Sequence, residues 1–246
     1  MSPHALVACH PLHATTMHTL AIDIGGTGLK ASVVDPKGNL VVDRLREDTP
    51  VGSHPDAFVE KLAAMVAPLP SYDRIAVGFP GMVRAGVVRT APHLGHDAWA
   101  GYPLAAALER RLGKPVRLGN DADVQGLAVV QGKGMEMVIT LGTGVGTSLY
   151  IDGKLCPHIE LGHSPFRKGE SYDQQLGEAA RKQVGTCKWQ KRVQKAIVDF
   201  RRLTMFDHLY IGGGNARRID FELPPDITLV DNNAGISGGA FLWRDG

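Results

Sequence analysis

From His18 onward, the hydrophobic positions of the chain alternate between strand-like runs and helical spacing. Continuous apolar runs that stop at glycine, proline or a polar turn predict buried strands. Apolar residues spaced three or four apart predict helices between them. The strands are expected over 19–24, 29–34, 39–46, 74–79, 115–119, 207–211 and 227–230, and the helices over 54–67, 102–113, 121–131, 173–184, 187–204 and after Asn232. This alternation is typical of an α/β fold.

The opening of this pattern occurs twice in the chain. Ile22 aligns with Ile139 and Asp35 with Asp152, a constant offset of 117 residues. Each copy reads as strand, glycine turn, strand and Asp-containing turn, which indicates a duplicated α/β unit. We therefore expect two similar lobes with a central cleft. The expected limits are 18–115 for the N-terminal lobe and 116–231 for the C-terminal lobe, with a helix in 232–246 packing back on the first lobe and 1–17 as a disordered tail.

Composition excludes several classes of protein. With 43% hydrophobic and 21% charged residues among 246, the chain resembles neither a disordered, a collagen-like nor a coiled-coil protein. No apolar run reaches the roughly 18–20 residues of a membrane span. Three cysteines are too few and too scattered for a disulfide framework or a Cys-rich zinc site, so we expect a cytoplasmic protein without zinc.

Three glycine turns follow predicted strands, at 25–28, 142–146 and 212–214. Glycine allows successive N–H groups to point into one concavity and removes the Cβ that would keep a phosphate away. None of the turns has the P-loop or dinucleotide-binding spacing. Each could be a simple bend, but three of them favour a phosphate site. Its candidate residues are Gly25, Gly26, Thr27, Lys30, Gly142, Thr143, Gly144, Gly146, Gly212, Gly213 and Gly214.

Acidic side chains accompany these turns. Asp23 ends the first strand, where it would either cap the turn or position Mg²⁺, directly or through water. Asp121 lies between a strand and a helix, a usual N-cap position. A phosphoryl transfer to an alcohol also needs a carboxylate near the hydroxyl, so Asp121 is the candidate base and Asp123 the second choice.

Glu160 and His163 form another polar pair, separated by Leu161 and Gly162. They would offer a hydrogen-bond acceptor and a switchable donor to sugar hydroxyls. A metal pair and an ordinary surface turn are the alternatives. No cysteine cluster follows, which argues against structural zinc.

Six motifs, in this order, resemble the ROK family of sugar kinases: DIGGTG from Asp23, GFPG from Gly78, NDA from Asn120, LGTGVG from Leu141, ELGH from Glu160 and YIGGGN from Tyr210. The resemblance covers about 19–244. It implies an actin-like ATPase (ribonuclease H-like) fold and a homodimer. It also implies that Asp121 deprotonates the sugar 6-hydroxyl and that the turns hold phosphates. The residues that it implies for the sugar are Gly81, Asn120, Glu160 and His163, together with one of Glu170 and Asp173.

The chain departs from the common family pattern at three points. Gly28 stands where many ATP-dependent members have Lys, the Cys-rich zinc motif after His163 is missing, and His93 replaces an expected asparagine. The first two departures, and the segment ELGHSPFRKG, are similar to the branch of the family that uses polyphosphate.

Positive charge is concentrated in 181–202. This segment holds eight basic residues and one acid, a local charge of +7, so the rest of the chain carries −5 of the net +2. Lys188, Lys191, Arg192 and Lys195 share one helix face by their spacing. A solvated amphipathic helix explains this pattern, and so does a binding site for a polyanion. The chain has only 6% aromatic residues and no nucleic-acid module, so nucleic acid is not the expected partner.

The predicted function is Mg²⁺-dependent transfer of a phosphoryl group from polyphosphate to the 6-hydroxyl of glucose, with ATP left open as a further donor. One alternative is a strictly ATP-dependent hexokinase for glucose or another hexose. Another is a sugar-sensing relative without catalysis, which is disfavoured because only about 17 residues precede the first strand, too few for a DNA-binding domain.

Overall fold

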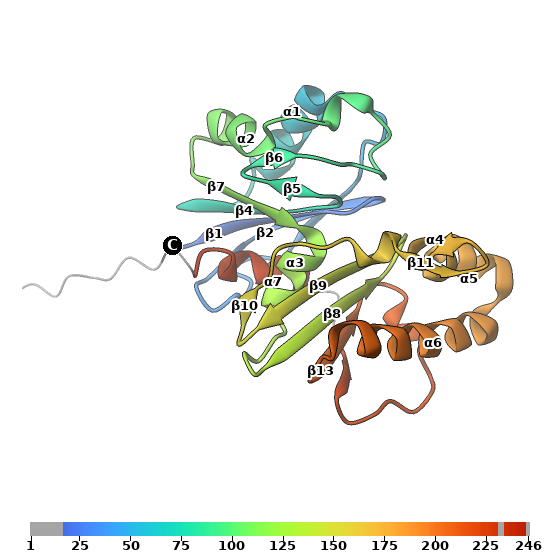
Figure 1. Ribbon diagram of the computed structural model, residues 1–246. Coiled ribbons are helices and arrows are strands. Elements are labelled where there is room, and N and C mark those ends of the chain that lie inside the picture. Colours follow the sequence, from blue (N-terminus) through green and yellow to red (C-terminus); the bar gives the residue numbers. More distant parts are fainter. Residues whose placement is uncertain (1–16, 231–233, 245–246) are drawn as a thin grey trace, which may run out of the picture.

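The structure is a computed structural model that describes residues 17–230 and 234–244, so nearly all of the expected tail lies outside the described residues. Two five-stranded sheets each carry helices of their own (Figure 1). The first sheet has the order β3-β2-β1-β4-β7. Its strands are β1 (Thr19–Ile24), β2 (Gly28–Val34), β3 (Leu45–Asp48), β4 (Arg74–Phe79) and β7 (Val116–Asn120), with a small hairpin of β5 (Val83–Arg84) and β6 (Val87–Val88) beside it.

The second sheet has the order β10-β9-β8-β13-β14. Its strands are β8 (Met135–Leu141), β9 (Val145–Ile151), β10 (Lys154–Leu155), β13 (His208–Gly212) and β14 (Ile227–Leu229). A second small hairpin joins β11 (Pro165–Arg167) and β12 (Glu170–Ser171). Short 3₁₀ turns are η1 (Asp97–Trp99), η2 (Leu161–His163) and η3 (Ala216–Arg218).

The two sheets repeat one topology. In each, the first two strands form an antiparallel hairpin, the third strand pairs with the outer side of the second, and two parallel strands follow the first. The hairpin turn lies between Ile24 and Gly28 in one sheet and between Leu141 and Val145 in the other. These positions differ by the predicted offset of 117 residues, so the expected duplication is confirmed.

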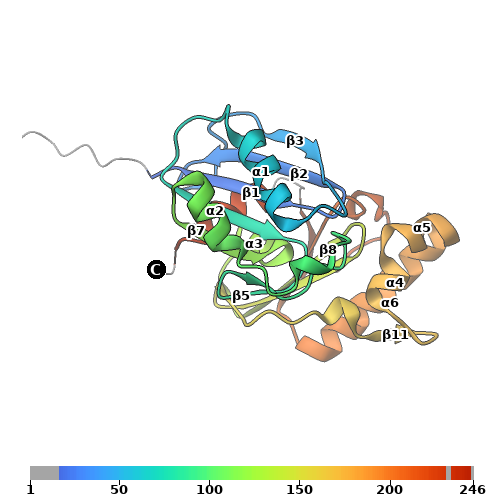
Figure 2. The ribbon, with the colours of Figure 1, turned by 90° about the horizontal axis from the view of Figure 1, so that it is seen from above.

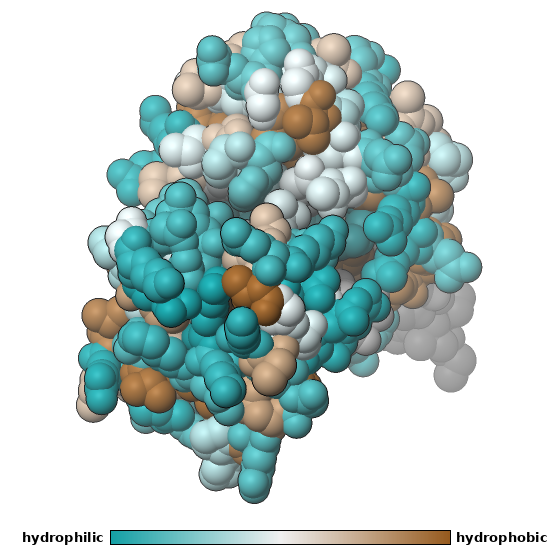
Figure 3. Space-filling view, turned by 90° about the vertical axis from the view of Figure 1, so that its right-hand side faces the viewer, coloured by the Kyte–Doolittle hydropathy of each residue, from teal (hydrophilic) through white to brown (hydrophobic). Residues whose placement is uncertain are grey.

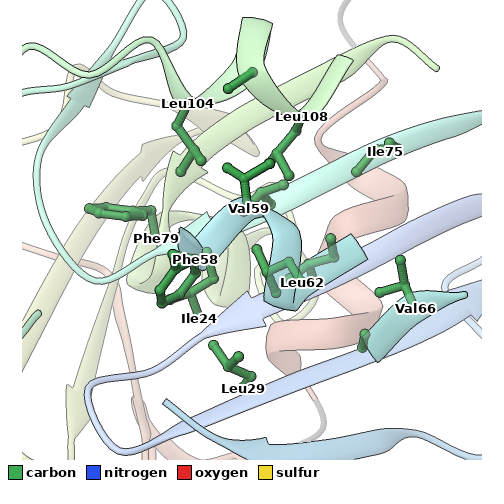
Figure 4. Packing of buried hydrophobic residues seen from close by; sticks show 14 of the residues in the cluster. Ile24, Leu29, Phe58, Val59, Leu62, Val66, Ile75, Phe79, Leu104 and Leu108 are labelled. Carbon is green, nitrogen blue, oxygen red and sulfur yellow. The ribbon is translucent and has the colours of Figure 1, made fainter. Parts of the chain in front are cut away.

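Helices α1 (Pro55–Val66) and α2 (Leu104–Leu112) cover the outer face of the first sheet (Figure 2). Phe58 and Leu62 of α1 are fully buried against Ile24 and Leu29 of the sheet, as Figure 4 shows from close by. Burying such side chains contributes roughly 1.5–3 kcal/mol each. This core holds β1 and β2 in place, the two strands that the first glycine turn connects.

The second sheet packs against α4 (Tyr172–Leu176), α5 (Glu178–Val184) and α6 (Thr186–Thr204). Trp189, Val193 and Phe200 of α6 are completely buried, and the Trp189 Nε1–H donates to the Leu176 carbonyl at 2.7 Å. The apolar stripe of α6 therefore faces the core, which leaves its basic face outward.

Two helices that are far apart in sequence, α3 (Asp121–Leu127) and α7 (Ala234–Phe241), pack together between the sheets (Figure 1). A Cβ at Gly238 would lie 1.8 Å from the Val124 carbonyl oxygen, and one at Gly126 would lie 2.1 Å from the Tyr150 hydroxyl. Only glycine allows these approaches. The described part of the C-terminal segment, α7, also contacts β1, β2 and β4 of the first sheet.

Three sequence-based expectations were wrong in detail. The strand expected at 39–46 begins only at Leu45, because the Asp35 carboxylate accepts from the backbone N–H groups of Lys37 and Asn39 and so holds the preceding residues in a turn. The helix expected over 173–184 breaks at Gly177, whose extended backbone (φ −63°, ψ 169°) separates α4 from α5. The strand β7 was expected to open the second lobe, but it pairs in parallel with β4 and so completes the first sheet.

No helix in the described ranges 17–230 and 234–244 is long and apolar enough to cross a membrane.

Candidate active site

A cavity of about 830 Å³ opens between the two sheets. It is lined by the β1–β2 turn, the segment after β4, the start of α3, the β8–β9 turn, η2 and the turn after β13. Residues proposed from the sequence make up much of this lining: Asp23, Gly25, Gly26, Thr27, Lys30, Gly81, Asn120, Asp121, Gly142, Thr143, Gly144, Gly146, Glu160, His163, Asp173, Gly213 and Gly214. The three glycine turns therefore converge on one space.

The turns approach one another closely because they carry no bulky side chains. A Cβ at Gly26 would lie 3.1 Å from the His93 Cβ and 3.9 Å from the Thr143 hydroxyl oxygen of the other sheet. The third turn passes over the second: Gly213 has φ +87°, and a Cβ there would lie 2.4 Å from the Leu141 carbonyl oxygen. The Asn215 amide donates to the Gly142 carbonyl at 3.2 Å and ties these two turns together.

Asp121 is the first residue of α3 and directly follows strand β7. The Asn120 side-chain oxygen caps this helix by accepting from the Ala122 N–H at 2.8 Å and the Asp123 N–H at 3.3 Å. The Asn120 amide nitrogen donates to the Gly81 carbonyl at 3.1 Å. These contacts fix the position of Asp121 in the cavity.

The electrostatic surroundings make Asp121 an unusually weak acid. Burial raises its pKa, and the nearby carboxylates of Asp23 and Glu160 raise it further, to about 7. The Ala122 N–H, which donates to Asp121 Oδ1 at 2.9 Å, opposes this shift. A carboxyl group with a pKa near neutrality is suited to accept a proton and release it again.

Asp23 forms an ion pair with Lys30 across the first hairpin, with Lys30 Nζ 2.7 Å from Asp23 Oδ2. Both side chains line the cavity. Mg²⁺ bound with phosphates usually takes one or two carboxylates from the protein. The second oxygen of Asp23 meets that requirement, so the residues present fit the metal. Within the described residues, no three His, Cys, Asp or Glu side chains form a group that would hold a metal on its own.

Glu160 faces the cavity with a histidine behind it. Its carboxylate Oε1 lies 3.1 Å from His158 Nε2. The contact with His158 lowers the Glu160 pKa against the opposing effect of burial, and the charges of His163 and His93 lower it further. Glu160 is therefore an ionised acceptor. His163, at the end of η2, lines the same part of the cavity.

Three candidates do not line this cavity. Asp123, the second choice for the base, is buried and its carboxylate contacts His158 instead. Glu170 accepts from the Gln175 amide and faces a separate hollow, because β12 turns it away from the cleft. Gly212 lies within strand β13, where a Cβ would lie 2.6 Å from the Gln125 amide nitrogen. Asp173, the rival of Glu170, does line the cavity, but its Oδ1 accepts from the Val145 N–H at 2.8 Å and so caps the second glycine turn.

Five arginines that no sequence motif indicated line the cavity beside the predicted Lys30: Arg44, Arg46, Arg181, Arg217 and Arg218. Arg46 pairs in register with Lys30 across β2 and β3. Arg217 and Arg218 follow the third glycine turn, and this adjacency was a usable signal. Arg181 was counted only as part of the basic segment. It donates to Glu178 at 2.9 Å, and both side chains line the cavity.

A second hollow, of about 810 Å³, lies beside the outward face of α6. It is lined by the four predicted patch residues Lys188, Lys191, Arg192 and Lys195, and also by Arg167 and Lys168. We call these six residues the basic hollow. Figure 3 shows the end of the molecule where α4 and α5 lie, and its surface is mostly hydrophilic with isolated apolar residues.

Duplicated α/β lobes that aim glycine turns and a weakly acidic carboxyl group into one cleft define a phosphotransferase-like protein with an actin-like ATPase fold. The ROK family model matches residues 19–191. A polyphosphate glucokinase of Mycobacterium tuberculosis is 32% identical to the chain, covering 94% of it and 92% of that protein. The chain therefore belongs to the ROK family.

Solved structures agree with this assignment. The inorganic polyphosphate/ATP-glucomannokinase of Arthrobacter sp. strain KM is 34% identical with a TM-score of 0.83, covering 92% of this chain and 97% of that one. A ROK family glucokinase of Streptomyces griseus, solved with glucose and AMPPNP, has a TM-score of 0.78 at 21% identity, covering 93% and 100%. The second comparison supports the fold.

Proposed function

We propose that the protein is a kinase that phosphorylates the 6-hydroxyl of glucose, with inorganic polyphosphate as phosphoryl donor and ATP as a second donor. The observation that carries this proposal is the Asp121 carboxyl group, which has a pKa of about 7 and lies between glycine turns from both sheets. The names of two relatives support the choice of substrates: the mycobacterial protein is a polyphosphate glucokinase, and the Arthrobacter protein is an inorganic polyphosphate/ATP-glucomannokinase.

In the proposed reaction, Asp121 accepts the proton of the glucose 6-hydroxyl while the O6 atom of glucose bonds to the terminal phosphorus of the donor. The bond from that phosphorus to the bridging oxygen breaks, and the bridging oxygen keeps the electron pair. The products are glucose 6-phosphate and a donor that is one phosphate shorter. Asp121 then releases its proton to solvent.

Glu160 and His163 are placed to hold the sugar in this reaction. An ionised Glu160 accepts hydrogen bonds from sugar hydroxyls, and the His163 ring accepts or donates according to its tautomer. Asn120 has a smaller role than the sequence suggested, because its oxygen is used by two backbone N–H groups and one amide hydrogen by Gly81. One amide hydrogen remains for the sugar.

The phosphates are held by electrostatic interactions from both sheets. The backbone N–H groups of the turns and the hydroxyls of Thr27 and Thr143 supply neutral donors, and the cavity arginines supply charge. Such preorganised donors stabilise the charge that develops on the transferring phosphoryl group. Mg²⁺ held by Asp23 would neutralise part of the donor's charge when bound. We propose that Asp23 orients the metal through its second oxygen or through water.

We further propose that the basic hollow holds the distal phosphates of a long polyphosphate chain. Lys188 and Lys191 are exposed, and the described residues give neither an ion-pair partner. Lys195 is partly committed, since its Nζ lies 2.5 Å from Asp199 Oδ2. A row of lysines binds a polyanion largely by releasing its counterions, and this binding weakens steeply with salt.

The central test is glucose 6-phosphate formation by the purified protein with long-chain polyphosphate, ATP or GTP over a panel of hexoses. Asp121→Ala should lower kcat by about 10²–10⁴-fold while leaving glucose binding in calorimetry nearly unchanged. Asp220→Asn, on an exposed residue, is the control. Near-normal turnover by Asp121→Ala would contradict the base assignment, and activity with ATP alone would identify a strictly ATP-dependent hexokinase.

The basic hollow is tested by charge reversal. The double substitution Lys188→Glu and Lys191→Glu should raise the KM for long-chain polyphosphate and flatten its salt dependence, while the KM for ATP changes little. The matched control reverses the exposed Lys114 and Lys154 elsewhere on the surface. If polyphosphate kinetics were indifferent to both the reversal and ionic strength, the hollow would not be the polyphosphate site.

We also propose a cytoplasmic homodimer, in line with the family resemblance. The end of α6 leaves Leu203 62% exposed and Met205 76% exposed, an apolar surface that a second copy would cover. Sedimentation analysis should show a dimer that Leu203→Lys with Met205→Lys converts to a monomer.

A further inference from the structure

One histidine outside the cavity contacts two acidic side chains, Asp123 of helix α3 and Glu160, which lines the cavity. His158 lies in the segment between β10 and η2, and its side chain is only 10% exposed. Its Nδ1 is 2.9 Å from the carboxylate of Asp123, which is 5% exposed, and its Nε2 is 3.1 Å from Glu160 Oε1. Asp123 belongs to the helix that begins with Asp121, whereas Glu160 faces the cavity from the other lobe.

The ring of His158 carries a positive charge at neutral pH. Burial opposes that charge, but the contacts with Asp123 and Glu160 outweigh it and raise the His158 pKa to about 10. An imidazolium donates from both nitrogens. The Nδ1–H is bonded to Asp123, whereas the Nε2–H is not aligned on Glu160, so that second contact is ionic.

We propose that His158 is a positioning residue of the kinase site, which holds the Glu160 carboxylate in place for the sugar and balances the negative charge of Asp123 and Glu160 near Asp121. This inference rests on the proposed function, because it needs Asp121 as the base and Glu160 as a sugar contact.

The charge balance follows from the groups around the cluster. Asp23 is paired with Lys30, whereas the three groups of the cluster itself, Asp123, Glu160 and His158, carry charges that sum to −1. Without His158 the sum would be −2. The groups that face this cluster are Asp23 and Lys30 from β1 and β2, His93 from the segment after β6, Asp121 and Asp123 from α3, Tyr150 from β9, and Glu160 and His163 from the η2 segment.

Other contacts already hold the base helix in place without His158. The Tyr150 hydroxyl donates to the Asp123 carbonyl at 2.6 Å, and the Ser148 hydroxyl donates to the Ala122 carbonyl at 3.1 Å. Loss of His158 should therefore leave α3 folded, and its effect should appear in the orientation of Glu160 and in the charge near Asp121.

The test compares His158→Gln, Asp123→Asn and the double variant with the unmodified protein, and uses His208→Gln as a matched histidine control. His208 lies on β13 and contacts Thr228 instead of the cavity. For each protein, kcat/KM for glucose is measured against pH at saturating polyphosphate, together with the separate kcat and KM. Thermal unfolding and glucose calorimetry show whether each variant is folded.

We expect the acid limb of the profile to move upward by about 0.3–1 pH unit in His158→Gln, because a lost positive charge makes Asp121 easier to protonate. It should move downward in Asp123→Asn and return near its original position in the double variant. The KM for glucose should rise about fivefold to tenfold in His158→Gln, because the ionic contact that orients Glu160 is lost. It should stay nearly unchanged in Asp123→Asn.

An unmoved acid limb, or a double variant that behaves like His158→Gln, would overturn the inference. If His158→Gln failed to fold, the test would rest on Asp123→Asn: an acid limb that stayed in place or moved to higher pH in that variant would also overturn the inference. If the unmodified protein phosphorylated glucose with none of the donors tested, the proposed function would be wrong. If the protein were active but the pH profile of His158→Gln were unchanged, only this inference would be wrong.

Discussion

At the scale of single residues, Asp121 shows how a site exchanges stability for chemistry. Its carboxyl group has a pKa of about 7 because burial and neighbouring carboxylates disfavour the ionised form. The folded chain therefore holds a proton that the unfolded chain releases near pH 4. The stabilisation that comes from keeping Asp121 protonated in the folded state is complete below pH 4 and is lost as the pH rises through 7.

Asp121→Asn should therefore stabilise the protein at high pH. At pH 8 the substitution removes the penalty of an ionised buried carboxylate, and the free energy of unfolding should rise by about 2–4 kcal/mol. Near pH 4, where Asp121 is neutral in the folded state, the two proteins should differ little. Urea unfolding at both pH values measures this difference, with Asp220→Asn as a surface control. Equal gains at both pH values would show that the effect is not one of ionisation.

The same ionisation should set the acid limb of catalysis. Below pH 7 the base is protonated, so kcat/KM for glucose should fall tenfold per pH unit on the acid side. A pH-rate profile of the unmodified protein, corrected for titration of the donor, measures the limb. A limb near pH 4 would mean that Asp121 is ionised in the free enzyme at all working pH values.

Residue types in short motifs were enough to find Asp121, the glycine turns and Glu160. His158 and Asp123 could not be paired from sequence, because 35 residues separate them and only the fold of β9 and β10 onto α3 joins them. The choice between Glu170 and Asp173 stayed open for a similar reason, because the direction of the Glu170 side chain depends on the turn between β11 and β12, which no periodicity reveals.

At the scale of elements, α3 depends on α7 for its position. Gly238 lets α7 contact the α3 backbone, and a Cβ there would lie 1.8 Å from the Val124 carbonyl oxygen. Because α3 begins with Asp121, any shift of this helix also moves the proposed base.

Gly238→Ala should destabilise the protein by about 1–3 kcal/mol, despite the better helix propensity of alanine, because the new methyl group overlaps a backbone atom. It should also lower kcat, because relaxing the overlap shifts α3 and with it Asp121. Ser237→Ala, in the same helix, is the control and should change both quantities little. Denaturant unfolding and steady-state kinetics provide the two readouts. Unchanged values for Gly238→Ala would show that the helices separate without consequence.

Elements with a repeated local pattern were predicted best. Both hairpins were found because strand, glycine turn and strand recur at one offset, and α6 was found from its apolar spacing. The strand at 39–46 was misplaced because Asp35 directs a longer turn than the Pro-Lys-Gly sequence suggests. The break at Gly177 was missed because one glycine within a helical pattern is usually tolerated.

At the scale of the whole molecule, the duplication predicted two lobes, but it did not show which sheet receives each parallel strand. Strand β7 joins the first sheet through pairing with β4, and the sequence between them contains α2 and a small hairpin. Such long-range pairing depends on the packed helices and not on any local pattern. It matters for function because it puts Asn120 and Asp121 at the edge of the first lobe, opposite Glu160 and His163.

Because groups from both lobes face the proposed sugar position, glucose should stabilise the molecule as a whole. At a concentration of 100 times its Kd, a ligand that binds only the folded state adds about 2.7 kcal/mol to the free energy of unfolding. Calorimetric melting with and without glucose, in the absence of donor, should therefore show one transition shifted upward. Glu160→Gln should lose most of this shift, whereas Glu222→Gln, on an exposed residue of the second lobe, should keep it. If two separate transitions appeared and glucose shifted only one of them, the sugar would be bound by a single lobe. Recognition would then not depend on Asp121 and Glu160 facing each other across the cleft.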